Sequence, residues 1–352
     1  MYKTILMTVA GAALLGSAFF LWGGGKRVTV HNNVSPEPVV AASETEAVAQ
    51  DPAGRNPLTG EICPGGDLRP MAVMLAADHV ARPLSGIAEA DVVVEMPALT
   101  GGITRYMAVY ACGRPEEIGA TRSARHDFLP FAKSFDAVYA HWGGSYLALD
   151  ILKQKVIDNV NALTSPAFYR VNDRPAPHNG FTSFAMLREA AHQAGYRMEN
   201  KATGYIHIAD GAVLSIDQDI AIGYPAPYHV RFSYHHAANA YLRFRGGEKE
   251  LDVATGRQVE VKNVVVMFAE SHQVNPDYND VAVEGEGDAM VYRNGQELRG
   301  KWKRAPETYE NKDGAGEKYF FYDALGKEIG FVPGKIWIAV VQPNQKVSLT
   351  VK

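Results

Sequence analysis

The sequence has little cysteine and no long run of charge of one sign. Its 352 residues include only two cysteines, Cys63 and Cys112, and no CxxC pair occurs. This argues against cysteine-based zinc sites and thioredoxin-like redox chemistry. The formal net charge is −4, and no basic block is present. We therefore expect no nucleic-acid partner, because such a partner requires a basic patch or stripe on the protein.

A hydrophobic stretch without any charge covers residues 5–22 and extends through three glycines to residue 25. A helix needs about 20 such residues to cross the hydrocarbon core of a bilayer. We predict one transmembrane helix, within an anchor of residues 1–27, that contacts the membrane through residues 5–25. A cleaved signal peptide is the alternative. The bulky end of the stretch, from Phe19 to Trp22, favours the uncleaved anchor because signal cleavage requires small residues.

Residues 28–55 show no periodicity and are rich in Val, Ala, Glu, Ser and Pro, which predicts a flexible spacer. From residue 56 to residue 203, strand-like apolar runs such as 71–76 alternate with helical patterns. This alternation predicts an α/β N-terminal domain.

From residue 204 to residue 352 the pattern changes to short segments of alternating polarity with few helical stretches. Asn294-Gly295 between two such segments is a strong hairpin signal. We therefore predict a mostly β C-terminal domain.

Many polar side chains of the first domain lie where predicted strands end. Ligands of open α/β sheets bind beyond the strand ends, so this placement predicts a binding site. Arginine forks match carboxylate or phosphate groups, so the expected ligand is an anion. Alternatively, the arginines at 105, 122 and 125 pair internally with acidic residues at 78, 91 and 95. The candidate ligand-binding residues are Asp78, Arg82, Glu95, Arg105, Arg122, Arg125, His141, Gly143, Gly144, Ser145, His178 and Asn179.

A serine hydrolase is the sharpest enzymatic hypothesis, with Ser145 as nucleophile and His178 or His141 as base. The sequence around Ser145 lacks the G-x-S-x-G pattern, so a helix N-cap is the favoured role of this serine. We predict no cofactor and no metal site. His235 and His236, for example, are adjacent and point apart on a strand.

The two cysteines have two open interpretations. In an extracytoplasmic protein Cys63 and Cys112 can form one disulfide, since that compartment is oxidising. The alternative is two separate buried thiols. The sequence does not decide between them, because the distance between the two Cα atoms is unknown.

Several motifs occur in a fixed order along the chain: NPLTG at 56–60, GGITR at 101–105, RSAR at 122–125, HWGGS at 141–145, PHN at 177–179 and PGKIW at 333–337. Together they resemble the YerB-like domain family, a bacterial family of unknown function. The resemblance extends over nearly all of residues 56–347. It implies a two-domain extracytoplasmic protein, commonly a lipoprotein, but no cysteine follows the hydrophobic stretch before Cys63. We therefore expect the helix itself to tether the protein to the bacterial cytoplasmic membrane.

Together these features predict a single-pass, membrane-anchored binding or scaffold protein of the bacterial cell envelope. Its body lies on the extracytoplasmic side and binds an anionic ligand or a cell-wall component, or has an envelope protein as partner. An envelope hydrolase that uses Ser145 and His178, or a histidine-held water, is one alternative. A structural partner of envelope assembly proteins is the other.

Overall fold

The computed structural model describes residues 53–99, 102–212, 215–304 and 318–352. The predicted anchor, residues 1–27, lies outside them, as does the predicted spacer up to residue 52. Within the described ranges no helix is long and apolar enough to cross a membrane. The spacer was expected to reach residue 55, but Ala53–Arg55 forms strand β1, which pairs with β2 (Ile62–Pro64). The folded body therefore includes these three residues.

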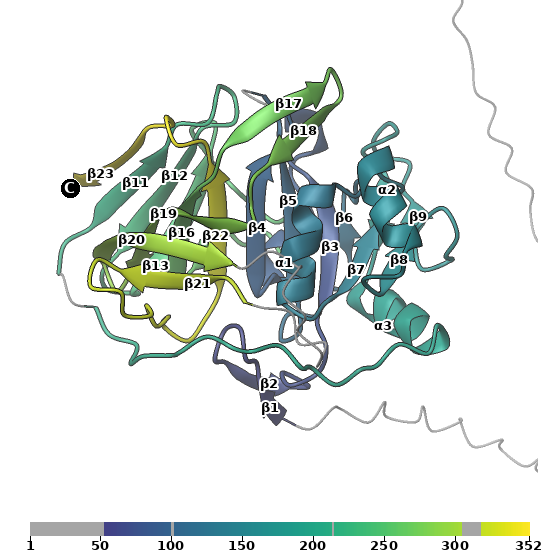
Figure 1. Cartoon of the computed structure of the whole chain (residues 1–352), viewed down its shortest axis with the longest axis horizontal. Helices are drawn as coiled ribbons and strands as arrows, with labels where there is room; N and C mark the ends of the chain where they lie inside the picture. Colours follow the sequence, from purple (N-terminus) through teal and green to yellow (C-terminus); the bar gives the residue numbers. More distant parts are fainter. Residues whose placement is uncertain (1–52, 100–101, 213–214, 305–317) are drawn as a thin grey trace, which may run out of the picture. The chain divides into compact units, whose positions relative to one another are not determined.

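One mixed sheet contains strands from both halves of the described chain (Figure 1). From the first half come β3 (Met71–Ala76), β4 (Val92–Pro97), β5 (Thr104–Tyr110), β7 (Val138–His141) and β8 (Asn159–Asn161). From the second half come β16 (Asn263–Phe268), β19 (Gly285–Arg293), β20 (Gln296–Arg304), β21 (Phe320–Asp323) and β22 (Ile336–Val341).

The order of these ten strands is β21-β20-β19-β16-β22-β4-β5-β3-β7-β8. Strand β22 lies between β4 and β16 and is parallel to both. The two halves are therefore joined by continuous backbone hydrogen bonding, through a strand that is near the C-terminal end of the chain.

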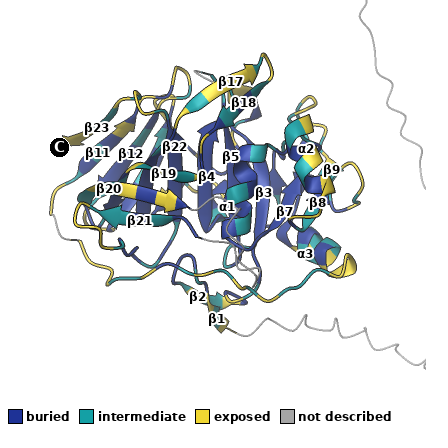
Figure 2. Ribbon diagram, in the orientation of Figure 1, coloured by how far each residue is buried: buried dark blue, intermediate teal, exposed yellow. Residues whose placement is uncertain are grey.

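Both faces of this sheet are buried, which explains why its central strands are continuously apolar (Figure 2). Side chains alternate between the faces: Val73 and Leu75 point one way, and Met74 points the other. The face of Met74 packs against helices α1 (Leu129–Ser134) and α2 (Tyr146–Lys153). The face of Val73 packs against helix α3 (Phe184–Gln193) and a second sheet.

The second sheet belongs to the C-terminal half and has six strands. They are β11 (Gln218–Ile222), β12 (Val230–His235), β13 (Ala240–Arg245), β14 (Glu248–Lys249), β15 (Glu260–Val261) and β23 (Val347–Val351). The order is β14-β13-β12-β11-β23, with β15 also paired to β13. Phe232 of β12 packs edge-on to Trp337 of β22, with ring centroids 6.0 Å apart.

Smaller elements lie around these sheets. A three-stranded sheet has the order β6-β10-β9, and β17 pairs with β18 in a hairpin. The hairpin contacts the N-terminal half, because the Tyr278 ring packs against Tyr146 of α2, with ring centroids 5.6 Å apart. The elements are β6 (Ile118–Gly119), β9 (Tyr169–Arg170), β10 (Gly180–Thr182), β17 (Ser271–Asn275), β18 (Tyr278–Val281) and the 3₁₀ turns η1 (His79–Ala81), η2 (Ile87–Glu89) and η3 (His126–Phe128).

The described chain thus has a mixed α/β N-terminal domain and a mostly β C-terminal domain, which confirms this part of the predicted fold class. The hairpin predicted at Asn294-Gly295 joins β19 to β20 and is also confirmed. Cys63 and Cys112 form a disulfide, with Cα atoms 5.6 Å apart, that ties β2 to the turn after β5.

Candidate anion-binding site

Backbone hydrogen bonds bring three separate loops of the N-terminal domain together beside the end of β3. The Arg122 N–H donates to the carbonyl of Met74 in β3, at 2.8 Å. The Trp142 N–H donates to the carbonyl of Arg122 at 3.0 Å, and the Thr121 N–H donates to the carbonyl of Gly180 at 2.7 Å. The segment around residue 122 is therefore held between the loops that contain His141 and His178.

Three arginines with one carboxylate lie at this junction, and we call Asp78, Arg105, Arg122 and Arg125 the arginine cluster. Arg105 is only 4% exposed, and its Nε and Nη1 atoms are buried without a hydrogen-bond partner among the described residues. Within the same part of the chain, the Nε atoms of Arg122 and Arg125 are also buried and unpartnered. Asp78 is the acidic member, with Oδ2 3.6 Å from Arg122 Nη2. The cluster therefore has more positive charge and more N–H donors than its own residues satisfy.

The pKa values of the cluster show that burial disfavours the charged form of these arginines. Burial, and then the nearby charges of Arg125 and Arg122, lower the pKa of Arg105 to about 9. Burial likewise lowers the pKa of Arg125. Burial and then the Arg122 charge lower the pKa of His178, which lies beside the cluster. A bound anion would relieve both the repulsion and the unsatisfied donors.

His141 and Ser145 support the site rather than face it. His141 is fully buried, and its Nδ1 and Nε2 atoms are 2.7 Å from the Gly143 carbonyl and 3.2 Å from Asn159 Oδ1. Burial lowers the pKa of His141, so the ring is held neutral. Ser145 is the N-cap of α2 and accepts a hydrogen bond from the Ala148 N–H at 3.2 Å, which confirms its predicted capping role.

Gly143, Gly144 and Asn179 shape the same loops. Gly143 has a φ of +62°, and a side chain here would be strained. Gly144 forms a bridge with Ala124, next to Arg125. Asn179 accepts a hydrogen bond from Arg170 at 2.5 Å and donates one to the Val171 carbonyl at 3.1 Å, so its amide is used within its own loop.

Glu95 lies on the opposite face of the large sheet from the arginine cluster. Arg105 pairs with Met96 in the register of β4 and β5, and successive residues of a strand point to opposite faces. The fully buried Glu95 carboxylate therefore faces the six-stranded sheet, where Arg243 and Arg245 of β13 each approach to 2.6 Å. Thr104 and Trp337 donate to it at 2.9 and 3.2 Å.

We call Glu95, Arg243, Arg245 and Glu250 the core ion-pair network. Arg243 pairs with Glu250 as well as with Glu95, and Tyr106 donates to Glu250 at 3.1 Å. Two arginines thus face two carboxylates, and the network links the two sheets. The sequence did not reveal these partners of Glu95, although Arg243 and Arg245 alternate in AYLRFR as inward-pointing residues do.

Arg82 also lies apart from the arginine cluster. It donates to the Ala77 carbonyl at 3.2 Å, and its guanidinium is 5.5 Å from the centre of the Tyr228 ring. With Arg245 and Lys249 it lines a cavity of about 370 Å³. Burial and then the charge of Arg245 lower the pKa of Arg82.

Two tyrosines at the arginine cluster were not predicted as site residues. Tyr139 of β7 is buried beside Arg105 and Arg125, and its pKa is raised by burial. Tyr278 comes from the C-terminal hairpin, and its ring centre is 5.3 Å from the Arg125 guanidinium. Alternation with His141 along β7 would have pointed to Tyr139. Nothing in the local sequence indicates that Tyr278 reaches the other domain.

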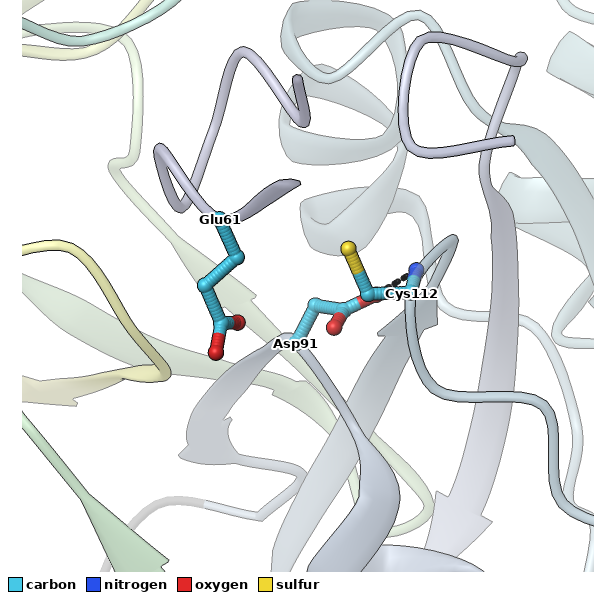
Figure 3. Close-up of side chains that lie close together, drawn as sticks. All are labelled: Glu61, Asp91 and Cys112. Atoms are coloured by element: carbon cyan, nitrogen blue, oxygen red, sulfur yellow. Dashed lines mark hydrogen bonds between the residues drawn. The ribbon is translucent and has the colours of Figure 1, made fainter. Parts of the chain in front are cut away.

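A second group of close side chains, Glu61, Asp91 and Cys112, serves the fold (Figure 3). The Cys112 sulfur is bonded to Cys63. The buried Asp91 carboxylate accepts backbone N–H donors from Ala111, Cys112 and Gly113 at 2.5, 2.8 and 3.2 Å. Burial raises its pKa to about 6. The hydrogen bonds to Asp91 fix the turn after β5. The Cys112 sulfur is not available as a metal ligand, because it is part of the disulfide.

The fold and site define a class of two-domain protein in which an α/β domain with a buried basic cluster is joined by one sheet to a mostly β domain. The chain belongs to the family described as "Protein of unknown function (DUF3048)". The N-terminal domain of that family matches residues 58–197, and its C-terminal domain matches residues 220–338. The predicted YerB-like membership is thereby confirmed.

Two comparisons agree with this membership. The chain is 29% identical over 290 residues to "Putative lipoprotein YerB" of Bacillus subtilis (strain 168), covering 80% of this chain and 84% of that protein. The crystal structure of YerB protein from Bacillus subtilis superimposes with a TM-score of 0.74 at 27% identity, covering 84% of this chain and 99% of that one.

Proposed function

We propose that this protein is a membrane-tethered binding protein of the cell envelope that captures an anionic group in the arginine cluster. The observation that carries the proposal is Arg105, which is 4% exposed and has two guanidinium nitrogens without a partner in the part of the chain that the structure describes. Buried donors left unsatisfied cost about 1–3 kcal/mol each, and more when charged, so an anion bound to Arg105 would be stabilised by these donors.

The ligand group that fits is a carboxylate or a phosphate. Both accept two parallel hydrogen bonds from one guanidinium, and phosphate offers further oxygens to a second and a third. A cell-wall component that bears such a group matches this chemistry. His178 and Tyr139 at the same place would add a neutral donor each.

The proposed location is outside the cytoplasm. The disulfide between Cys63 and Cys112 supports it, because disulfides persist in oxidising compartments. The relative from Bacillus subtilis is named a lipoprotein. In this chain both cysteines of the sequence are joined to each other, so neither carries a lipid. We propose that the hydrophobic segment 5–25 provides the tether.

The test is calorimetric titration of the full chain in detergent with inorganic phosphate and with cell-wall fragments that bear phosphate or carboxylate groups. The double variant Arg122→Ala/Arg125→Ala should bind at least about 100-fold more weakly, since each of the two lost charge-assisted hydrogen bonds contributes about 1.5–3 kcal/mol. Arg257→Ala/Arg299→Ala is the matched control, because these two side chains are 57% and 70% exposed and lie outside the cluster. Absence of binding, or equal binding by both double variants, would refute the proposal.

A further inference from the structure

A second cluster of polar side chains lies where the β17–β18 hairpin meets η3. His126 and Asp127 come from η3, and Asp280 comes from β18. His126 Nε2 is 3.1 Å from Asp127 Oδ1 and 3.0 Å from Asp280 Oδ1. One ligand atom from each residue lies within 4.8 Å of the others. Two carboxylates and an imidazole thus converge from parts of the chain 154 residues apart.

A second histidine, His272, lies at the rim beside Asp280 and outside this group of three. The two residues are directly opposite each other in the register of β17 and β18, so their side chains emerge on the same face of the hairpin. His272 Nε2 is 3.6 Å from Asp280 Oδ2. The Asp280 carboxylate therefore has one imidazole at each oxygen.

The distances match a coordination sphere. Ligand atoms about 2.1 Å from a metal ion lie ~3.0–3.4 Å from their neighbours in octahedral or tetrahedral geometry. The separations of 3.0 and 3.1 Å around His126 fall in this range. Asp127 is also held in place, because the same Oδ1 accepts the Val281 N–H at 3.1 Å. Such outer hydrogen bonds to a ligand carboxylate are usual at metal sites.

The surroundings provide both room and access. His126, Asp127 and Asp280 line one cavity of about 410 Å³. Asp127 is 4% exposed, His126 18%, Asp280 43% and His272 71%, so the cluster opens from a buried floor to a solvent-accessible rim. His126 Nε2 faces the two carboxylates, and Nδ1 is buried without a hydrogen-bond partner among the residues that the structure describes.

We propose that His126, Asp127 and Asp280 bind a divalent transition-metal ion. One imidazole with two carboxylates suits Zn²⁺ or Mn²⁺ better than Ca²⁺ or Mg²⁺, which prefer all-oxygen sites. The ion fixes the β17–β18 hairpin of the C-terminal domain against η3 of the N-terminal domain. This site is separate from the arginine cluster and does not depend on its ligand.

The test is titration of Zn²⁺ into the full chain, without a polyhistidine tag, after removal of metal with a chelator. We expect one ion per chain, and Asp280→Asn should weaken binding by about 100-fold or more, since even outer-sphere changes cost 10–100-fold. Asp277→Asn is the matched control, because it makes the same change in the same hairpin away from the cluster. His236→Ala controls for the surface pair of His236 with Asp217.

Co²⁺ gives a second readout that does not depend on stability. Visible absorption of the Co²⁺ form should report mixed nitrogen and oxygen coordination in the unmodified chain and in Asp277→Asn, and should be lost in Asp280→Asn. The proposal fails if Zn²⁺ does not bind, if Asp280→Asn binds as tightly as Asp277→Asn, if His236→Ala removes the binding, or if Ca²⁺ binds more tightly than Zn²⁺.

Discussion

The two faces of the large sheet each bury arginine side chains, but with opposite consequences. The core ion-pair network sets two arginines against two carboxylates, and Glu95 accepts from both. The arginine cluster sets three arginines against one carboxylate, Asp78. Buried charge therefore serves the fold where partners match it in number, and indicates a ligand where they do not.

The largest expected effect comes from breaking the core ion-pair network. Glu95→Gln leaves Arg243 and Arg245 buried with too few carboxylates, and we expect a loss of about 3–5 kcal/mol in the free energy of unfolding. Chemical denaturation measures this loss. Glu248→Gln in exposed β14 is the control and should change stability by less than about 0.5 kcal/mol. Equal stability of both variants would mean that the ion pairs of Glu95 do not stabilise the fold.

Asp91 extends the comparison of buried charges to a carboxylate that accepts hydrogen bonds from backbone N–H groups. Its pKa in the folded protein is about 6, above the usual value of 3.8, so the folded state binds the proton more tightly than the unfolded state. The stability from this group is present below about pH 4 and is lost as the pH rises to about 6. Relative to Asp91→Asn, the unmodified chain should lose up to about 3 kcal/mol over this window. Parallel pH profiles of the two chains would contradict this.

Arg105 tests the arginine cluster, which is the second of the two regions compared. In a buffer without phosphate or carboxylates, Arg105→Met should leave the free energy of unfolding unchanged or raise it, since the charge is buried without a matching partner. The same variant should bind the anion about 10–100-fold more weakly. Thermal unfolding with and without phosphate measures both quantities. A large loss of stability in the anion-free buffer would assign Arg105 to the fold.

The smallest effect is expected at Ser145. Ser145→Ala removes the cap of α2 and should cost about 1 kcal/mol, as should Ser183→Ala at the cap of α3. Anion binding should be unchanged in both variants. A serine-reactive phosphonate should form no adduct at Ser145, whose hydroxyl is buried and engaged with the Ala148 N–H. An adduct would revive the hydrolase hypothesis.

Local pattern was enough to predict several elements of the fold. The apolar run at residues 71–76 is strand β3, Ser145 caps a helix, and Asn294-Gly295 turns a hairpin. The loop residues around Arg122 could also be selected from the sequence as a group, because strand ends and turns are local features. These signals arise from neighbours in the chain, and so the sequence carries them directly.

Pairing between distant segments was decided only by the tertiary structure. Glu95 and Arg105 flank one turn in the sequence, yet the two-residue period of β4 and β5 sends them to opposite faces. Glu95 then meets Arg243, 148 residues away, and His126 meets Asp280, 154 residues away. The sequence by itself determined which residues carry charge, and it indicated which form strands and which cap helices. Which charges are matched, and which remain open to a ligand, follows from sheet register and from β22 joining the two domains.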